Sequence, residues 1–199
     1  MSNLLQLKNV LINKSLKSEI FENNKYLELR TEALNIFNVI KELKEDANLL
    51  FNQLTDITVV DYPSRKKRFD IVYLLSSLTL NLRILVKSSI EEKTLLESIV
   101  SLHKSANWYE RECYDLFGIQ FVNHPDLRRI MTDYNFEGHP LRKDFPLTGH
   151  TEVRYDDLEK KVVYESVKLN QEYRNFDYMS PWEGLDNELI GDEKSKDES

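Results

Sequence analysis

The apolar positions in the first half of the chain follow the spacing of regular elements. Apolar residues recur every three or four positions from Ala33 to Leu43, with Thr31 as an N-cap, which predicts a helix over residues 32–45. The expected helices are a short one around Leu4–Leu11, then 32–45, 93–103 and 108–117, and the expected strands are 25–29, 57–62, 69–75 and 82–86. Because these elements do not alternate regularly, they predict an α+β fold with a small mixed β-sheet packed with helices.

The second half of the chain lacks such periodicity. All five glycines and four of the five prolines follow Phe117. Arginine and aromatic residues, which dominate interface hot spots, recur every few positions there. A long segment without secondary structure is unusual inside a compact domain, so we expect a long, extended C-terminal arm that neighbouring proteins order. The predicted organisation is an α+β domain over residues 1–122, an extended partner-binding arm over 123–183 and an acidic tail over 184–199.

Composition excludes several classes of protein. The net charge is −7, and seven acids against two lysines fall within residues 181–199, which argues against a general nucleic-acid binder. Cys113 is the single cysteine, so this chain forms no internal disulfide and no cluster held by several thiolates. The longest uncharged run, residues 71–82, is shorter than the roughly 20 residues of a membrane-spanning helix. The first thirty residues resemble neither a secretory signal nor a matrix-targeting peptide.

The predicted helix 108–117 carries the most charged pattern in the chain. Asn107 is expected as its N-cap, with Glu110 in a capping box, and Gly118 just beyond its end. Glu110 and Glu112 border an apolar stripe but point about 160° apart, so they cannot form a close catalytic pair and are expected to pair with arginines. The arginines expected for Glu112 are Arg128, Arg129 or Arg142, an i,i+4 pair is expected between Arg111 and Asp115, and Cys113 is expected in the core.

Two other groups of residues invite a functional interpretation. His103, His124, His139 and His150 show no i,i+3 or i,i+4 spacing with one another or with Cys113, so turn and interface roles are favoured over a metal site. The basic run over residues 65–68 lies between two predicted strands. A solvated hairpin tip or a partner contact is favoured there over phosphate binding.

Six segments of the chain resemble one known family. They are Asp61–Pro63, Arg68–Tyr73, Trp108–Ile119, His124–Ile130, Gly138–Gly149 and Phe176–Glu183. Together they resemble the thirty-kilodalton subunit of respiratory complex I, which is known as the C subunit in bacteria and as subunit 9 in mitochondria. The resemblance spans roughly residues 55–183, leaving the amino-terminal third and the acidic tail outside it.

The resemblance implies a core subunit of the hydrophilic arm of proton-pumping NADH:ubiquinone oxidoreductase. Such a protein supports assembly of the quinone-reducing module and packs on the large quinone-site subunit, the forty-nine-kilodalton or D-type one, and on neighbouring iron–sulfur subunits. FMN, iron–sulfur clusters and quinone are bound by other subunits, so no catalytic, cofactor-binding or metal-binding residue is expected here. The isolated chain is expected to have no activity. It would associate with the membrane through the complex alone, on the matrix side of a mitochondrial inner membrane or the cytoplasmic face of a bacterial plasma membrane.

The residues expected at partner interfaces, which also carry the family signature, belong to the helix 108–117 and the arm. They are Glu110, Arg111, Glu112, Asp115, His124, Pro125, Arg128, Arg129, His139, Arg142, Lys143, Asp144, Phe145, Arg154, Tyr155, Arg174, Phe176 and Trp182.

Three alternatives belong to other classes of protein. The first is the equivalent subunit of a membrane-bound hydrogenase or formate-hydrogen lyase, which a nickel-bearing partner would reveal. The second is a hydrolase that uses Glu110 and Glu112, against which the helix geometry argues. The third is an RNA-binding protein that uses residues 65–68, which salt-dependent RNA binding would support.

Overall fold

The computed structural model describes residues 2–13, 18–22, 26–169 and 171. The helices are α1 (Ser2–Asn13), the 3-10 turn η1 (Ala33–Asn35), α2 (Ile36–Glu45) and α3 (Ala106–Phe117). The strands are β1 (Ser18–Glu22), β2 (Leu27–Thr31), β3 (Gln53–Asp61), β4 (Phe69–Ser77), β5 (Leu82–Ile90), β6 (Leu95–Glu97), β7 (Gln120–Val122), β8 (Thr151–Asp156) and β9 (Lys161–Ser166).

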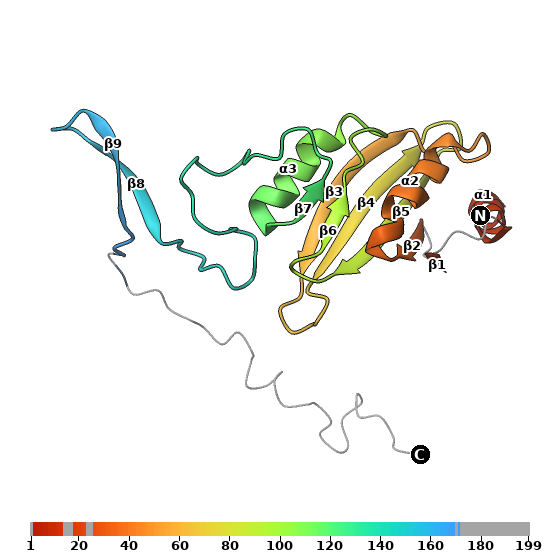
Figure 1. Ribbon diagram of the computed structural model, residues 1–199, viewed down its shortest axis with the longest axis horizontal. Helices are drawn as coiled ribbons and strands as arrows, with labels where there is room; N and C mark the ends of the chain where they lie inside the picture. Colours follow the sequence, from red (N-terminus) through yellow and green to blue (C-terminus); the bar gives the residue numbers. More distant parts are fainter. Residues whose placement is uncertain (1, 14–17, 23–25, 170, 172–199) are drawn as a thin grey trace, which may run out of the picture. The chain divides into compact units, whose positions relative to one another are not determined.

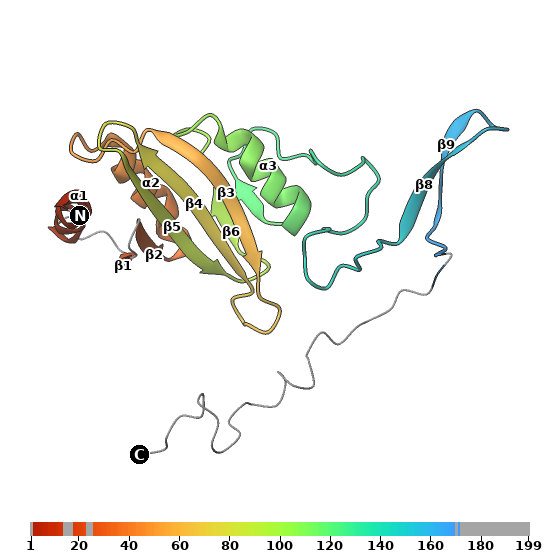
Figure 2. The same cartoon turned by 180° about the vertical axis from the view of Figure 1, so that it is seen from behind.

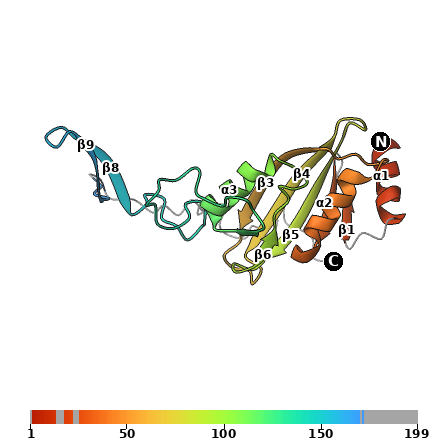
Figure 3. The same ribbon diagram turned by 45° about the horizontal axis from the view of Figure 1, so that its top comes forward.

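A five-stranded sheet organises the first 149 residues. Its strand order is β1-β2-β5-β4-β3, with β2 and β5 parallel and every other neighbouring pair antiparallel (Figure 1). α2 lies across one face of this sheet, as the turned view shows (Figure 3). Among the described residues, no helix lies on the opposite face of β3, β4 and β5 (Figure 2). The mixed sheet with few helices confirms the predicted α+β class.

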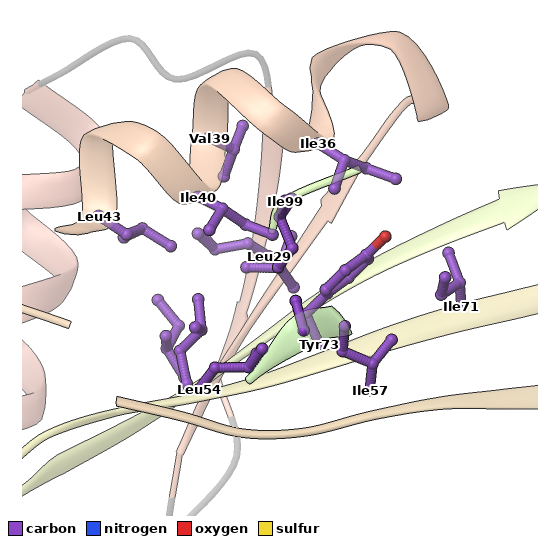
Figure 4. Close-up of a cluster of buried hydrophobic side chains, with 14 of the residues drawn as sticks. Leu29, Ile36, Val39, Ile40, Leu43, Leu54, Ile57, Ile71, Tyr73 and Ile99 are labelled. Atoms are coloured by element: carbon purple, nitrogen blue, oxygen red, sulfur yellow. The ribbon is translucent and has the colours of Figure 1, made fainter. Parts of the chain in front are cut away.

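The core lies between α2 and the sheet. Alternate residues of each strand point inward, so Ile57, Ile71 and Tyr73 meet the face of α2 that carries Ile40 and Leu43 (Figure 4). All five are at most 2% exposed. The alternation of the strands and the helical spacing of α2 therefore bury the same layer of side chains from two sides.

Most predicted elements of the first half are confirmed, with shifted ends. The strands expected at 25–29, 57–62, 69–75 and 82–86 correspond to β2, β3, β4 and β5, and the first helix to α1. The helix expected over 32–45 begins as the 3-10 turn η1, with Glu32 as its N-cap. Thr31, the expected N-cap, is the last residue of β2.

The helix predicted over residues 93–103 is wrong. Residues 95–97 form the strand β6, which pairs in parallel with β7, and turns follow to residue 104. Leu96 and Ile99 are buried as a helical stripe would require, but the backbone amide of Ser98 donates to Val122 O at 3.0 Å. Pairing with a distant strand thus outweighs the local pattern.

α3 packs against β3 and begins earlier than predicted. Its N-cap is Ser105 rather than Asn107, and no capping box forms. Cys113 is 2% exposed and donates to Ile57 O at 3.5 Å, which confirms the predicted core thiol. Burial raises the pKa of this thiol far above its usual range.

The described residues from 150 onward form a second unit. β8 and β9 make an antiparallel hairpin that the sequence analysis did not predict. The sequence contained a signal for it: valine and tyrosine alternate with charged residues at 152–156, and residues 162–164 are a β-branched and aromatic run. The acidic tail lies outside the described residues, and the boundary expected at residue 122 stays a prediction. Within the described part of the chain, the longest helices are too short and too polar to span a bilayer.

Candidate functional site

The carboxyl end of α3 is covered by the chain that follows it. Gly118 has a φ of 80°, in the left-handed region, and its amide donates to Tyr114 O at 2.8 Å. A helix leaves its last carbonyls without partners, and residues 139–142 supply donors to three of them. These hydrogen bonds are His139 Nδ1 to Asp115 O (2.8 Å), Leu141 N to Leu116 O (3.1 Å) and Arg142 Nε to Phe117 O (2.7 Å). This part of the arm therefore completes α3.

The approach of the arm to Gly118 leaves no room for a side chain. A Cβ atom there would lie 2.6 Å from Arg142 NH2 and 2.7 Å from His139 Nε2. Burial lowers the pKa of His139, and the Arg142 charge lowers it further, although the hydrogen bond to Asp115 O favours the charged ring. The neutral ring with its proton on Nδ1 satisfies this contact.

Asp115 binds the next turn of the arm from inside the protein. Its carboxylate is fully buried and accepts hydrogen bonds from Ile130 N, Met131 N, Thr132 N, Thr132 Oγ1 and Arg129 NH1, at 2.5–3.0 Å. Burial alone raises the pKa of a carboxyl, but these donors stabilise the charged form more strongly and hold the Asp115 pKa well below its usual range. The side chain thus acts as a fixed anion around which residues 129–132 fold.

The predicted pair between Arg111 and Asp115 does not form. Arg111 donates instead to the backbone carbonyls of Arg128 and Arg129, both at 3.0 Å, so it fixes the arm from the other side. The predicted partners of Glu112 are also wrong. Arg128, Arg129 and Arg142 pair with Asp126, Asp115 and Glu92, respectively. Glu112 is half-buried, and no ion pair involves it among the residues that the structure describes.

Glu110 is buried without any arginine, contrary to the prediction. Its carboxylate accepts from Ser98 Oγ at 2.6 Å and from Ile99 N at 2.8 Å, which ties α3 to the chain after β6. Burial raises its pKa to about 7, although both hydrogen bonds act in the opposite direction. His124 Nε2 lies 3.9 Å from Oε2 of this carboxyl.

His124 joins the start of the arm to the first turn of α3. Its Nε2 donates to Asn107 O at 3.1 Å, and its Nδ1 accepts from Asp126 N at 3.1 Å. The side chain is fully enclosed. Since one ring nitrogen donates and the other accepts, the geometry matches a neutral imidazole with a structural role.

A second anchor joins the arm to the turn between β3 and β4. Arg68 makes a double hydrogen bond with Asp61, at 2.7 and 2.8 Å, and reaches Asp144 at 2.9 Å. Lys143 N donates to Asp61 Oδ2 at 2.8 Å. The Arg68 hydrogen bonds hold the pKa values of both Asp61 and Asp144 below their usual range. Arg68 therefore connects the sheet to the Asp144 carboxylate, and Asp61 connects it to the Lys143 backbone.

Two aromatic side chains of the arm pack against each other. Phe136 and Phe145 pack with their ring centroids 5.7 Å apart, and the arm turns at Gly138, where a Cβ atom would lie 2.9 Å from the Phe145 ring. Arg142 also pairs with Glu92. Its guanidinium lies 5.3 Å from the centroid of Phe69, the first residue of β4.

The hairpin β8–β9 presents two unlike faces. Val153 lies opposite Tyr164 and Tyr155 opposite Val162, so these four side chains share one face. Each is between 54% and 58% exposed. The other face is charged: Arg154 pairs with Glu165 at 2.7 Å. The hairpin thus exposes an apolar face, defined by these four residues.

The predicted interface residues therefore fall into groups. The structure brings those from Glu110 to His139, together with Arg142, to α3 or its neighbourhood, except for Pro125, whose ring is exposed. Lys143 and Asp144 contact Asp61 and Arg68 instead, and Phe145 packs on Phe136. Arg154 and Tyr155 belong to the hairpin. Arg174, Phe176 and Trp182 lie outside the described residues. Asp61, Arg68, Ser98 and Thr132 hold the site together but were missed as site residues, because each acts through a contact distant in sequence.

Most charged groups around α3 are used in internal contacts, Glu112 being an exception among the described residues. Among the described residues, no three histidine, cysteine or acidic side chains converge as metal ligands. What the arrangement can do chemically is hold a chain segment in a fixed path along one helix. The fold and site thus define a small α+β protein with an arm built onto its third helix.

A family model described as the 30-kilodalton subunit of respiratory-chain NADH dehydrogenase matches residues 29–151. The chain belongs to this family. Similar curated proteins are the C subunits of NADH-quinone oxidoreductase from Hyphomonas neptunium, 56% identical over 86% of this chain and 85% of that protein, and from Roseobacter denitrificans, 57% identical over 87% of each. The C subunit of the Brucella ovis enzyme is 58% identical over 85% of this chain and 84% of that protein.

Two solved structures share the fold. A trypsin-resistant fragment (1–134) of Nqo5 is 33% identical, with a TM-score of 0.54 over 61% of this chain and 99% of the fragment. A chain of the membrane-bound sulfane sulfur reductase, an archaeal respiratory membrane complex, is 25% identical, with a TM-score of 0.63 over 72% of this chain and 85% of that one. The curated relatives are markedly closer in sequence, so the complex I assignment is favoured over the hydrogenase alternative.

Proposed function

We propose that this chain is a structural subunit of an NADH-quinone oxidoreductase and that the hairpin β8–β9 docks on another subunit of that complex. The observation that carries the proposal is the apolar face of Val153, Tyr155, Val162 and Tyr164, more than half exposed at every position. A two-stranded hairpin by itself is marginally stable in water, so this one needs a further surface to pack against. Tyrosine is also one of the residue types enriched at interface hot spots.

The proposal concerns only the part of the arm beyond residue 149. Residues 124–145 have partners within their own chain, on α3 and on Asp61. The expectation that the whole segment from Asp126 is ordered mainly by neighbours is therefore replaced by one limited to residues from 150 onward. The trypsin-resistant fragment (1–134) of Nqo5 supports a compact first part and a more accessible remainder in this family.

The partner that fits is the large, D-type quinone-site subunit, with iron–sulfur subunits beside it. The family resemblance supports this choice. The flavin, the iron–sulfur clusters and the quinone would be held by those other subunits, and the isolated chain would have no oxidoreductase activity. The named relatives come from bacteria, which favours the cytoplasmic face of a bacterial plasma membrane over a mitochondrial inner membrane.

The experiment replaces the apolar face by threonine, which keeps the β-propensity of the hairpin. The quadruple variant Val153→Thr, Tyr155→Thr, Val162→Thr, Tyr164→Thr is expressed with an affinity tag in cells that lack the native chain. We expect the variant to fold but to recover little NADH-quinone oxidoreductase activity and few other subunits from solubilised membranes.

The matched control is Glu152→Thr, on the charged face of the same hairpin. It should co-purify the active complex at the level of the unaltered chain. If the quadruple variant also recovers the full complex, the apolar face is not the docking surface. Oxidoreductase turnover by the purified chain alone would contradict its structural role.

A further inference from the structure

A polar pocket involves Arg30, Asp70, Lys87 and Ser89, which alternate along their strands with the residues that face α2. Its volume is about 710 Å³, within the range of small-molecule sites. β2, β4, β5 and the turn between β3 and β4 supply most of its lining. None of the residues that join α3 to the arm lines it, so the proposed docking role does not use this pocket.

Four cations converge on the pocket from separate elements. Arg30 of β2 and Lys87 of β5 are register partners in the parallel pair, and both side chains lie on the same face. Like charges directly opposite one another in a sheet are destabilising. Arg65 and Lys67 come from the turn before β4. Arg30 is paired within its own strand, with Glu28 at 2.6 Å, so Lys87, Arg65 and Lys67 are the cations that depend on other groups.

The internal anions neutralise this charge incompletely. Asp70 is 1% exposed and accepts from Ser89 Oγ at 2.5 Å, while Lys87 Nζ lies 3.1 Å and Arg65 NH1 3.4 Å from its other oxygen. One carboxylate is thus shared by two cations. Lys67 is exposed, and no anionic partner for it occurs in the described ranges of the chain.

The remaining polar groups in the pocket specify more than a simple anion. Glu19 and Glu32 line the same pocket and are exposed. Their carboxylates repel a bare polyanion but accept from ligand hydroxyl groups.

We propose that this pocket binds a small phosphate ester that also carries hydroxyl groups, the chemistry of a sugar phosphate or a nucleotide. Lys67, Lys87 and Arg65 receive the phosphate, since Lys and Arg are its usual partners in proteins. Glu32 or Glu19 accepts from the sugar hydroxyls, as acidic residues do in dinucleotide sites. The ligand supplies the anionic partner that Lys67 lacks among the described residues.

The test titrates the full-length chain with ribose 5-phosphate, ADP and inorganic phosphate by calorimetry at low salt. We expect saturable binding of both esters, more tightly than inorganic phosphate. Lys67→Ala should weaken ester binding by about tenfold or more. We expect Lys67 to make the strongest contact with the ligand, because no carboxylate of the described residues neutralises it. Since Lys67 has no partner to lose among the described residues, the variant should remain folded. Ribose 5-phosphate binding without ADP binding would identify a sugar phosphate, and tighter ADP binding a nucleotide.

Lys66→Ala is the matched control, because Lys66 lies in the same turn, pairs with Glu91 at 3.6 Å and does not line the pocket. It should change the affinity by less than about twofold, the size of a general screening effect. The double variant Glu32→Gln, Glu19→Gln should reduce the difference in affinity between ribose 5-phosphate and inorganic phosphate. Equal weakening by the two lysine variants, or no saturable binding of either ester at millimolar concentration, would overturn the proposal.

Discussion

Arg68 and Asp61 form a buried, two-point ion pair at the end of β3, with Nε–Oδ1 at 2.7 Å and NH2–Oδ2 at 2.8 Å. The same guanidinium reaches Asp144 of the arm, and the same carboxylate accepts from Lys143 N. Each partner therefore binds both the other and the arm, so the pair couples the folding of the sheet to that of the arm.

Removing Arg68 should lower the free energy of unfolding much more than removing an exposed charge does. Arg68→Ala leaves the Asp61 carboxylate buried without its cation, which typically costs about 3 kcal/mol or more. Arg65→Ala is the control, since its side chain is 53% exposed and meets Asp70 at 3.4 Å; its loss should stay below about 1 kcal/mol. Urea unfolding of the full-length chain measures both. Equal losses of unfolding free energy in the two variants would show that the geometry of the Arg68–Asp61 pair contributes little.

Asp115→Asn tests the fixed anion beneath the arm. The amide group keeps the size of the side chain but replaces one acceptor by a donor, facing the donors of residues 130–132. Hydrogen bonds to a charged group contribute about 1.5–3 kcal/mol each, so the free energy of unfolding should fall by at least about 2 kcal/mol. The Met131 and Thr132 amides should then exchange faster with solvent.

Asp126→Asn is the matched control for Asp115. Asp126 pairs with Arg128 at 2.9 Å, but the two side chains are 52% and 71% exposed. The loss of unfolding free energy should be under about 0.5 kcal/mol.

Because the pKa of Asp115 is lowered in the folded chain, its stabilisation is present above the ordinary pKa of an aspartate and is lost as the pH falls further. Asp115→Asn should therefore flatten acid unfolding below about pH 4.

Glu110 should give the opposite pH dependence. Its folded pKa is about 7 and its ordinary value 4.5, so the folded state binds the proton more tightly. Its contribution is complete below pH 4.5 and decreases as the pH rises to about 7, by on the order of 3 kcal/mol. Glu110→Gln should remove that decline between pH 5 and 8, as measured by urea midpoints. An unchanged pH slope would contradict a buried, titrating Glu110.

The strands and the core were predictable, whereas the contacts around α3 were not. Alternation in β3 and β4 and the stripe of α2 are local signals, and each pointed to the correct element. The sequence analysis predicted an arginine partner for Glu110. Its partners are instead Ser98 and the Ile99 amide, which come close to it only in the folded chain. A hydrogen bond to a backbone amide in a distant turn corresponds to no recognisable pattern in the sequence.

The same limitation affects where the chain can be divided. The domain expected over residues 1–122 lacks His139, Leu141 and Arg142, which donate to the last carbonyls of α3. The structure places a better cut after Gly149, at the limit of the first compact unit. We expect a chain ending there to fold and to be absent from the membrane complex.

Amide hydrogen exchange, compared between the free full-length chain and the purified complex, tests the central claim most directly. In the free chain, the amides of Met131, Thr132 and Leu141 should be protected, because their acceptors lie within α3. Those of β8 and β9 should exchange rapidly in the free chain and become protected in the complex. If the hairpin amides are already as protected in the free chain as those of β4, or stay unprotected in the complex, the hairpin is not the docking element.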